Sequence, residues 1–412
     1  MLSSFLIRNF RSILELRLDF TFGEGKAPNR YKEQEIMPFF DAPGKHRLVP
    51  CMAFFGANAS GKTNILKAFN SLGGLVRGDS NLQAHFDPNM LNRKFEDTTF
   101  ELTFVNGKSS FIYRLVFNAS EIKEESLSKD GEVVFGIHQM NPVFSPGLLS
   151  AAYTLEKLTD IIRVECSDGE GRQKRPFLSR IGPSYSGLSA DLNAAFGYIS
   201  KLNYLDSNPQ GIHPIIAVNI LASSLNGDGN AALQEIADVV RRLDIDVHGL
   251  DILKKEVGQN EPFQFVAFVH INAQAGTRHS FHTISKHKDV DGNVLSFDFD
   301  KHESAGTIRL VGLMGLVLHA LNVGGLLIID ELGFVPLSKT GAELLFELIS
   351  QRYERGATLI TSNLPFDEWT ETFGSERLTG ALLDRLTHHV NILEMNGESY
   401  RLGQSKARQD KA

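Results

Sequence analysis

The sequence predicts an α/β fold in which a mainly parallel sheet is flanked by helices, with an added antiparallel β lobe and an α+β insertion. Three observations support this prediction. A glycine-rich loop at Gly56–Thr63 separates a strand from a helix, and an apolar strand at Leu326–Glu331 ends in two acids. Two strand-like segments, 98–105 and 110–117, flank Asn106-Gly107, which is a strong hairpin signal.

The loop reads GANASGKT, the complete pattern G-x-x-x-x-G-K-[ST] of a phosphate-binding loop, and it therefore predicts a P-loop NTPase core. A chance glycine-rich turn is the alternative, but the apolar strand 48–55 and the following helix are the flanks that such a loop requires. We expect Lys62 to reach the β- and γ-phosphates and Thr63 to ligate Mg²⁺. The loop residues predicted to contact the nucleotide are Gly56, Asn58, Ser60, Gly61, Lys62, Thr63 and Asn64.

The segment LLIIDE supplies the acids that such a site needs. A buried strand would deliver Asp330 and Glu331 to the phosphate end of a parallel sheet. Asp330 would then hold Mg²⁺ through water, and Glu331 would orient or deprotonate the attacking water. An ordinary buried strand with a solvated end is the alternative, and the phosphate loop upstream favours the catalytic interpretation. The two motifs together predict hydrolysis of ATP.

Length and composition predict an intracellular globular enzyme. The chain has 412 residues, of which 42% are hydrophobic and 22% charged, enough for a large core in several lobes. We expect an N-terminal lobe at 1–135, an accessory lobe at 136–300 and a C-terminal lobe at 301–412. The net charge of −7 argues against a broadly basic nucleic-acid binder. A local basic patch of Arg172, Lys174 and Arg175 is the alternative, but such a run is more often a solvated loop.

Cysteine usage and hydropathy point to the cytoplasm. Only Cys51 and Cys166 are present, so a disulfide framework is not expected. Arg8 and Arg11 come too early for a signal peptide. The longest apolar stretch, 311–329, contains polar residues and leads into the acids, so we expect core and no membrane span.

Further elements follow from periodicity and turn signals. Alternation predicts two short strands in Ser4–Phe20, and a polar loop follows at 23–47. The accessory lobe mixes a helix at 230–243 with a strand at 263–271 and a turn at Asp291-Gly292. A capped helix beginning at Thr340 precedes a strand at 357–361.

That last strand would deliver Asn363 to the same sheet edge as Glu331. A polar side chain there can sense the γ-phosphate. The alternative is a turn residue before Pro365.

Residues 1–325 resemble the ABC-type ATPases of the RecF, SMC and OLD/RloA-like group, many of them implicated in DNA repair or phage defence. The matching segments are LIRNFRSI at 6–13, FGANASGKTNIL at 55–66 and ESAGTIRL at 303–310. The resemblance implies that the S-x-G-T element, with Ser304 and Gly306, caps the γ-phosphate of the opposite subunit in a head-to-tail dimer. A plain helix cap is the alternative for this tetrapeptide.

From about Leu326 almost to the end, the sequence resembles the carboxy-terminal half of IstB, the AAA+ transposition-helper ATPase of insertion sequences. The matching segments are IIDELGFVPLSKTGAELLFELISQRYERGATLITSNLPFDEWTETFG and ALLDRLTHHVNILEMNGESYRL. The resemblance implies that Asp330 and Glu331 are the magnesium and catalytic acids, Asn363 the first sensor and Arg385 a trans-acting arginine finger. A surface cation paired with Asp384 is the alternative for Arg385.

The two resemblances conflict. A switch histidine expected in the first family is replaced by TSN at 361–363, and the phosphate loop and DNA-binding domain of the second are replaced. The apparent join lies in GGLLIIDEL, a segment in which the two families have nearly the same sequence. The chain is thus predicted to be a chimera, with ATP as nucleotide by family likeness.

Three functions stay open: an ATPase of DNA metabolism in transposition, repair or phage defence, an ATP-gated assembly protein, or an idle chimera. The implied partners are further copies, in a head-to-tail dimer or larger AAA+ assembly, and DNA with a transposase or effector nuclease. A metal-dependent nuclease is weaker, since the spacing of His279, His282, His287 and Asp289 matches no metal motif and a solvated hairpin explains it.

Overall fold

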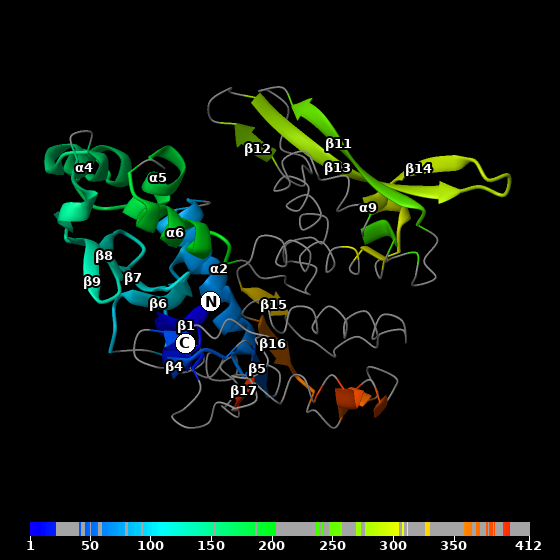
Figure 1. Cartoon of the computed structure of the whole chain (residues 1–412), viewed down its shortest axis with the longest axis horizontal. Helices are drawn as coiled ribbons and strands as arrows, with labels where there is room; N and C mark the ends of the chain where they lie inside the picture. The colour runs from blue at the N-terminus through cyan, green and yellow to red at the C-terminus, as the bar shows by residue number, and fades with distance from the viewer. Residues whose placement is uncertain are drawn as a thin grey trace, which may run out of the picture. The chain divides into compact units, whose positions relative to one another are not determined.

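The computed structural model divides the chain into two compact units (Figure 1). The first comprises Met1–Tyr204, Ile328–Leu337 and Ile349–Ala412, and the second comprises Leu205–Leu327 and Ser338–Leu348. The prediction of three lobes stays a prediction. The structure describes residues 1–21, 41–42, 46–49, 51–56, 60–78, 81–91, 94–150, 153–185, 188–202, 234, 236–238, 241, 247–257, 269–272, 277–304, 307–308, 311, 326–329, 358–364, 368–370, 376–377, 379–381, 383 and 390–395.

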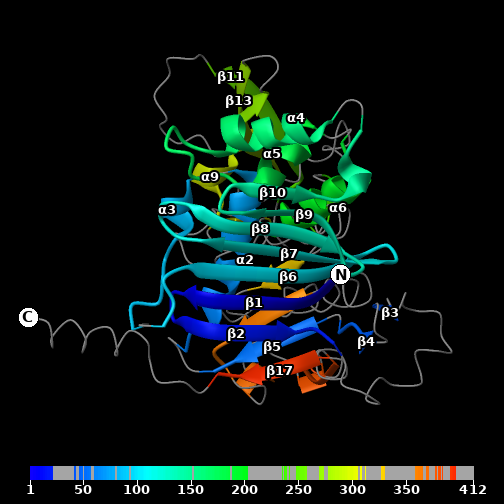
Figure 2. The ribbon, with the colours of Figure 1, turned by 90° about the vertical axis from the view of Figure 1, so that its left-hand side faces the viewer.

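The largest sheet of the first unit has seven strands in the order β10-β9-β8-β7-β6-β1-β2, visible face-on in Figure 2. All its pairs are antiparallel. Every pair except β1–β6 joins strands that follow one another in the chain through a short turn, which reverses its direction. The hairpin predicted around Asn106 is confirmed, with Gly107 at a φ of 62°. The strands are β1 (Leu2–Phe10), β2 (Ile13–Asp19), β6 (Thr98–Asn106), β7 (Ser109–Phe117), β8 (Ile122–Lys129), β9 (Glu132–His138) and β10 (Asn141–Phe144).

A second sheet carries the phosphate loop and has the order β15-β16-β5-β17. Its strands are β5 (Cys51–Phe55), β15 (Leu327–Ile329), β16 (Thr358–Ser362) and β17 (Val390–Glu394). Both β16 and β17 run parallel to β5, with Ser362 and Glu394 in register with Phe55. The parallel sheet predicted around the loop is therefore present, but among the described residues the larger sheet is antiparallel. The prediction of a mainly parallel fold holds only around the loop.

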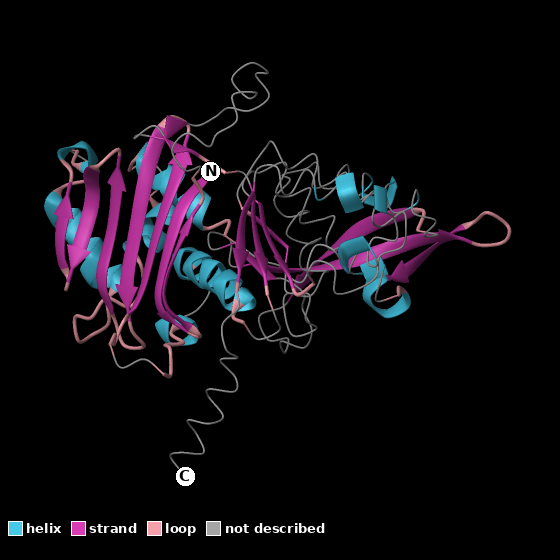
Figure 3. Cartoon of the chain, turned by 90° about the horizontal axis from the view of Figure 1, so that it is seen from below, coloured by secondary structure: helices cyan, strands magenta, loops and turns pink. Residues whose placement is uncertain are grey.

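Helix α2 (Lys62–Arg77) follows the phosphate loop and packs on the large sheet (Figure 3). The rings of Phe69 and Phe5 lie 4.4 Å apart between centroids, and Phe5 also contacts Phe100 at 5.8 Å. All three side chains are fully buried, and each such ring contributes about 1.5–3 kcal/mol. The apolar stripe of α2 thereby ties the loop to the antiparallel lobe.

A buried carboxylate joins α5 to the sheet. Glu125 on β8 accepts hydrogen bonds from the backbone N–H groups of Phe177 at 2.7 Å and Leu178 at 3.0 Å. Tyr113 and Gln173 donate to the same carboxylate at 3.0 and 2.6 Å. Glu125 thus caps a helix that has no side-chain cap of its own. The other short elements that the structure describes in this unit are β3 (Asp41–Ala42), β4 (His46–Arg47), α3 (Leu82–His85), η1 (Pro146–Leu148), α4 (Leu155–Ile161), η2 (Ile162–Cys166), α5 (Phe177–Ser184) and α6 (Ala190–Ile199).

The second unit is built on a long central strand. β13 pairs with β11 on one side and with β12 and β14 on the other, all antiparallel. The turn predicted at Asp291-Gly292 closes the β13–β14 hairpin, with Gly292 at a φ of 83° (Figure 3). Its described elements are β11 (Gly249–Val257), β12 (Val269–Asn272), β13 (Thr277–Lys288), β14 (Val294–Asp298) and α9 (Phe299–His302).

The predicted strands in Ser4–Phe20 correspond to β1 and β2, and the strand predicted at 357–361 corresponds to β16. The helix predicted from Thr340 and most of the polar loop at 23–47 lie outside the described residues. No helix in the described part of the chain is long and apolar enough to span a bilayer.

Candidate functional site

The phosphate loop has the backbone that an anion site requires. β5 ends at Phe55, and Gly56 and Gly61 adopt φ values of 147° and 104°. α2 begins at Lys62 without a side-chain cap, and its first turn contains no acidic residue. The positive end of a 16-residue helix is therefore left without a capping side chain of its own, as phosphate binding requires.

Lys62 lies folded across this loop. Its Nζ atom donates a hydrogen bond to the carbonyl oxygen of Gly56 at 2.6 Å, and the residue is only 5% exposed. A buried ammonium needs an acceptor, and here the loop itself supplies one. The predicted phosphate-binding lysine is thus already placed at the loop. Thr63 stands next to it in the first turn of α2.

The turn between β1 and β2 supports the start of α2. Arg11 donates from Nε to Oδ1 of Asn64 at 2.8 Å, while Asn64 donates from Nδ2 to Oγ of Ser12 at 2.7 Å. The Arg11 guanidinium also pairs with Asp87 at 2.9 Å. Both Oδ1 and Nδ2 of Asn64 are therefore hydrogen-bonded to residues of this turn. Sequence reasoning did not assign Arg11 and Ser12 to the site, and their only signal was the NFRS segment.

Met395, after β17, closes the other side of the loop. Its N–H donates to the carbonyl oxygen of Phe55 at 2.7 Å. Its own carbonyl oxygen lies 2.4 Å from the position that a Cβ on Gly56 would occupy, and its methyl carbon lies 3.6 Å from a Cβ position on Gly61. This close approach explains the glycine at 56, and no sequence motif announced it.

Asn363 lies at the same sheet edge as the loop. It follows Ser362, which is in parallel register with Phe55. The Oδ1 atom of Asn363 and the Oγ atom of Ser60 are buried and have no hydrogen-bond partner in the described part of the chain. Buried polar atoms are rarely left unpaired, so both fit a site that takes a polar ligand.

The acids follow β15 directly, and β15 lies beside β16. Asp330 and Glu331 themselves lie outside the described residues, as do Asn58, Gly306 and Arg385. Their roles stay predictions. Buried Ile328 and Ile329 show that the strand before the acids is a core strand, as the apolar run predicted.

Ser304, in the second unit, has the geometry of a helix cap. Its Oγ accepts a hydrogen bond from the N–H of Thr307 at 3.1 Å and lies 2.9 Å from the Thr307 hydroxyl. Its carbonyl oxygen accepts from the N–H of Ile308 at 2.9 Å. These hydrogen bonds are those of a helix cap, which is the alternative interpretation of this tetrapeptide. Contact with a nucleotide of another chain stays a prediction.

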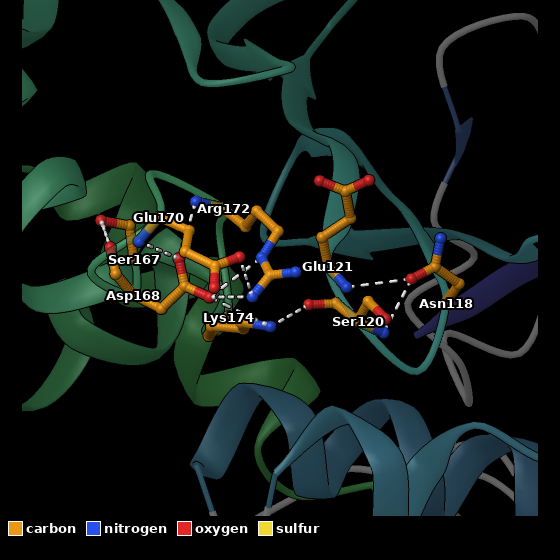
Figure 4. Close-up of polar contacts among 8 residues, drawn as sticks. All are labelled: Asn118, Ser120, Glu121, Ser167, Asp168, Glu170, Arg172 and Lys174. Carbon is orange, nitrogen blue, oxygen red and sulfur yellow. Dashed lines mark hydrogen bonds and ion pairs between the residues drawn. The ribbon is translucent and has the colours of Figure 1, made fainter.

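The basic run at 172–175 is largely neutralised within its own loop (Figure 4). Arg172 pairs with Asp168 at 2.9 Å and with Glu170 at 2.6 Å, and Lys174 pairs with Asp168 at 3.3 Å. Hydrogen bonds from the Arg172 backbone and side chain, with Lys174, hold the pKa of Asp168 well below its usual range. The run is a self-paired loop, which argues against a nucleic-acid patch there.

The histidines do not form a metal centre among the described residues, where no group of three metal-ligating side chains occurs. His287 instead pairs with Glu303 at 2.6 Å. The hairpin interpretation of this segment agrees with the β13–β14 turn.

A glycine-rich loop, a buried lysine and an uncapped helix end on a parallel strand define the class of phosphate-loop nucleotide-binding proteins. Two family models match different parts of this chain. Residues 309–408 match "IstB-like ATP binding protein", and residues 51–137 match "AAA domain, putative AbiEii toxin, Type IV TA system". The first match begins upstream of the join predicted near Leu326. The chain is thus a chimera of two P-loop ATPase-like segments.

Among curated proteins, the chain is 43% identical over 89 residues to "Insertion sequence IS21 putative ATP-binding protein" of Pseudomonas aeruginosa, covering 22% of this chain and 34% of that protein. It is 44% identical over 77 residues to the corresponding IS232 protein of Bacillus thuringiensis subsp. berliner, covering 19% and 31%. The chain therefore spans about a third of the length of these relatives.

SMC head domains are among the solved structures to which this chain is similar. One, bound to the C-terminal winged-helix domain of ScpA, is 12% identical with a TM-score of 0.38, covering 88% of this chain and 89% of that chain. Another, from Thermotoga maritima, is 13% identical with a TM-score of 0.36 and the same coverage.

Proposed function

We propose that this chain binds ATP with Mg²⁺ at the phosphate loop and hydrolyses it in the DNA metabolism of a mobile element. The observation that carries the proposal is the start of α2, where an uncapped helix end and the buried Lys62 ammonium meet. The relatives named for insertion sequences and ATP binding support the mobile-element context. Transposition is favoured over repair or phage defence on that ground.

The residues at the loop fit a nucleoside triphosphate. Gly56 and Gly61, with φ values of 147° and 104°, suit a loop whose backbone turns around the phosphates. The N–H groups at the start of α2 and the Lys62 ammonium would take the β- and γ-phosphate oxygens. The unpaired Oγ of Ser60 lies in the same loop. A phosphate oxygen would accept a hydrogen bond from this hydroxyl group.

Thr63 and Asp330 would hold Mg²⁺, which neutralises charge on the phosphate oxygens when bound. In this proposal Glu331 orients or deprotonates the attacking water, and Asn363 senses the γ-phosphate through its amide. Arg385 of another subunit would neutralise the charge that develops as the phosphoryl group departs. The place of Asn363, directly after Ser362 at the loop edge of the parallel sheet, supports its part.

Self-association belongs to the same proposal. Two elements, Ser304–Thr307 and Arg385, would act on a nucleotide held by another copy. Ser304 already caps a helix start whose N–H groups suit an anion. An ATP-gated assembly that hands DNA chemistry to a transposase is therefore the second candidate.

The first test compares wild type with Lys62→Ala and Glu331→Gln. We expect Lys62→Ala to lose binding of a fluorescent ATP analogue, and Glu331→Gln to keep binding but lose turnover by at least about a hundredfold. Full turnover in Lys62→Ala would overturn the proposal. Light scattering on Glu331→Gln with Mg-ATP then reads the assembly, since blocked hydrolysis traps the nucleotide-bound form.

A further inference from the structure

A buried carboxylate stands directly before the Ser304 cap. The side chain of Glu303 is only 8% exposed, and its Oε1 lies 2.6 Å from Nε2 of His287. With the carboxylate oxygen of Glu303 as the acceptor, Nε2 of His287 is the donor of this contact. Because a buried carboxylate without a partner is costly, the contact with His287 constrains where Glu303 can lie.

His287 is itself held in place by a rigid hairpin. It lies near the end of β13, in register with Leu295 of β14, and its ring packs edge-on against Phe297 at 5.5 Å between centroids. Two residues further on, Asp289 closes the turn by accepting from the backbone N–H groups of Asp291 and Asn293, both within 2.9 Å. The His287 ring is therefore held by the strand pairing of the hairpin and by its contact with Phe297.

The His287–Glu303 contact is linked to the Ser304–Thr307 element by the backbone, because Ser304 directly follows Glu303. The N–H of Glu303 donates to the carbonyl oxygen of Phe299 at 3.2 Å, so Glu303 ends α9. Ser304 follows at once and caps the next helical turn through Thr307 and Ile308. Glu303 is thus held by its side chain at His287 and by its backbone at α9, directly before the element.

We propose that His287 is a positioning residue for the nucleotide-contacting Ser304–Thr307 element, acting through the carboxylate of Glu303. This inference rests on the proposed function, in which that element meets the γ-phosphate of a second copy. The hairpin β13–β14 then sets the direction in which the cap is presented. His287 thereby contributes to the transition state of hydrolysis and to ATP-driven association, whereas binding of ATP to the loop of the same chain does not depend on His287.

The test uses three substitutions at His287 and one at a second histidine, all in the full chain. His287→Ala removes the donor, whereas His287→Gln keeps an amide nitrogen at about the reach of Nε2. His287→Asn carries the same amide on a chain one carbon shorter and serves as the matched control. His138→Ala, at an exposed histidine of β9, controls for loss of an imidazole as such.

Two readouts are taken, and the first needs no nucleotide. We expect hydrogen exchange of the peptide containing Thr307 and Ile308 to rise at least about fivefold in His287→Ala and His287→Asn, and to stay near wild type in His287→Gln. In ATP turnover, kcat falls about tenfold in the first two variants with KM within about twofold, and His287→Gln restores it to within about threefold.

The outcomes distinguish failure of the positioning role of His287 from failure of the proposed ATPase function. Absence of ATP binding and turnover in the wild type overturns the proposed function and the role of His287 with it. Normal wild-type turnover with unchanged exchange and kcat in His287→Ala overturns the positioning role alone. Loss of activity in His287→Gln equal to that in His287→Ala also overturns it, because a donor at that place would then have no effect.

Discussion

The backbone N–H of Met395 donates to the carbonyl oxygen of Phe55 at 2.7 Å, directly before the phosphate loop. Phe55 lies in the segment that matches the AbiEii-type AAA model, and Met395 lies in the segment that matches the IstB-like model. β16 and β17, both from the second segment, flank β5 from the first in parallel register. The strand that leads into the phosphate loop of one segment therefore lies between strands of the other.

This contact predicts that Gly56→Ala is far more damaging than its small size suggests. The new Cβ would lie 2.4 Å from the Met395 carbonyl oxygen, at a φ of 147° that side chains rarely adopt. We expect ATP affinity to fall at least about tenfold, with about 2–4 kcal/mol lost from the free energy of unfolding. Urea denaturation and binding of an ATP analogue measure the two effects.

Gly107→Ala is the matched control for that substitution. Gly107 also has a positive φ, 62°, but nothing lies within 4 Å of its Cβ position. Only about 1 kcal/mol of stability is expected to be lost there, with ATP affinity unchanged. Equal effects in the two variants would show that contact with Met395 is unimportant.

Arg11→Ala is predicted to weaken nucleotide binding while leaving stability almost unchanged. The guanidinium holds Asn64 in the first turn of α2 at 2.8 Å, and its partly exposed pair with Asp87 adds at most about 1 kcal/mol. We expect the KM for ATP to rise about threefold to tenfold and the melting temperature to move little. Arg17→Ala, which removes an exposed pair with Glu101, should leave both unchanged.

The buried Glu125 predicts a specific pH dependence of stability. Burial raises the pKa of this carboxyl group, and the four hydrogen bonds it accepts only partly offset that effect. A raised folded-state pKa means that its favourable contribution is complete below the unfolded pKa and is lost as pH rises through the folded one. The free energy of unfolding of wild type, minus that of Glu125→Gln, should therefore decrease with rising pH.

Urea titrations at steps from acid to neutral pH measure this difference. Glu132→Gln, at an exposed glutamate of β9, should show no such trend. A difference that grows as pH rises would mean that the hydrogen bonds from Phe177, Leu178, Tyr113 and Gln173 outweigh the cost of burial.

Cys166 is predicted to be unreactive in the folded protein. It is 1% exposed, and burial with the nearby Glu125 raises the pKa of its thiol far above the usual value. Since the thiolate is the reactive form, alkylation by iodoacetamide at pH 8 should be at least about a hundredfold slower than in urea. Peptide mass spectrometry reads the Cys166 peptide separately from that of Cys51. Rapid labelling of the native chain would contradict the buried geometry.

Local sequence patterns were sufficient for the elements that short-range chemistry specifies. Glycine spacing and the flanking strand and helix predicted the phosphate loop, and the Asn-Gly and Asp-Gly pairs predicted both turns correctly. Alternation predicted β1, β2, β6 and β7 because side chains on half-buried strands repeat every two residues. The placement of Asn363 at the loop edge followed from the rule that parallel strands end together.

The sequence by itself determined the phosphate loop, the prediction of a nucleotide ligand and the joining of two family-like segments. Each of these depends on residues that are neighbours in the chain. Only the tertiary structure decided that the largest described sheet is antiparallel, and that Arg11 holds Asn64, Glu125 caps α5 and Met395 closes on Gly56. These contacts join residues separated by dozens or hundreds of positions. Such pairs leave no periodic signal, because the partner is chosen by packing in three dimensions and not by spacing along the chain.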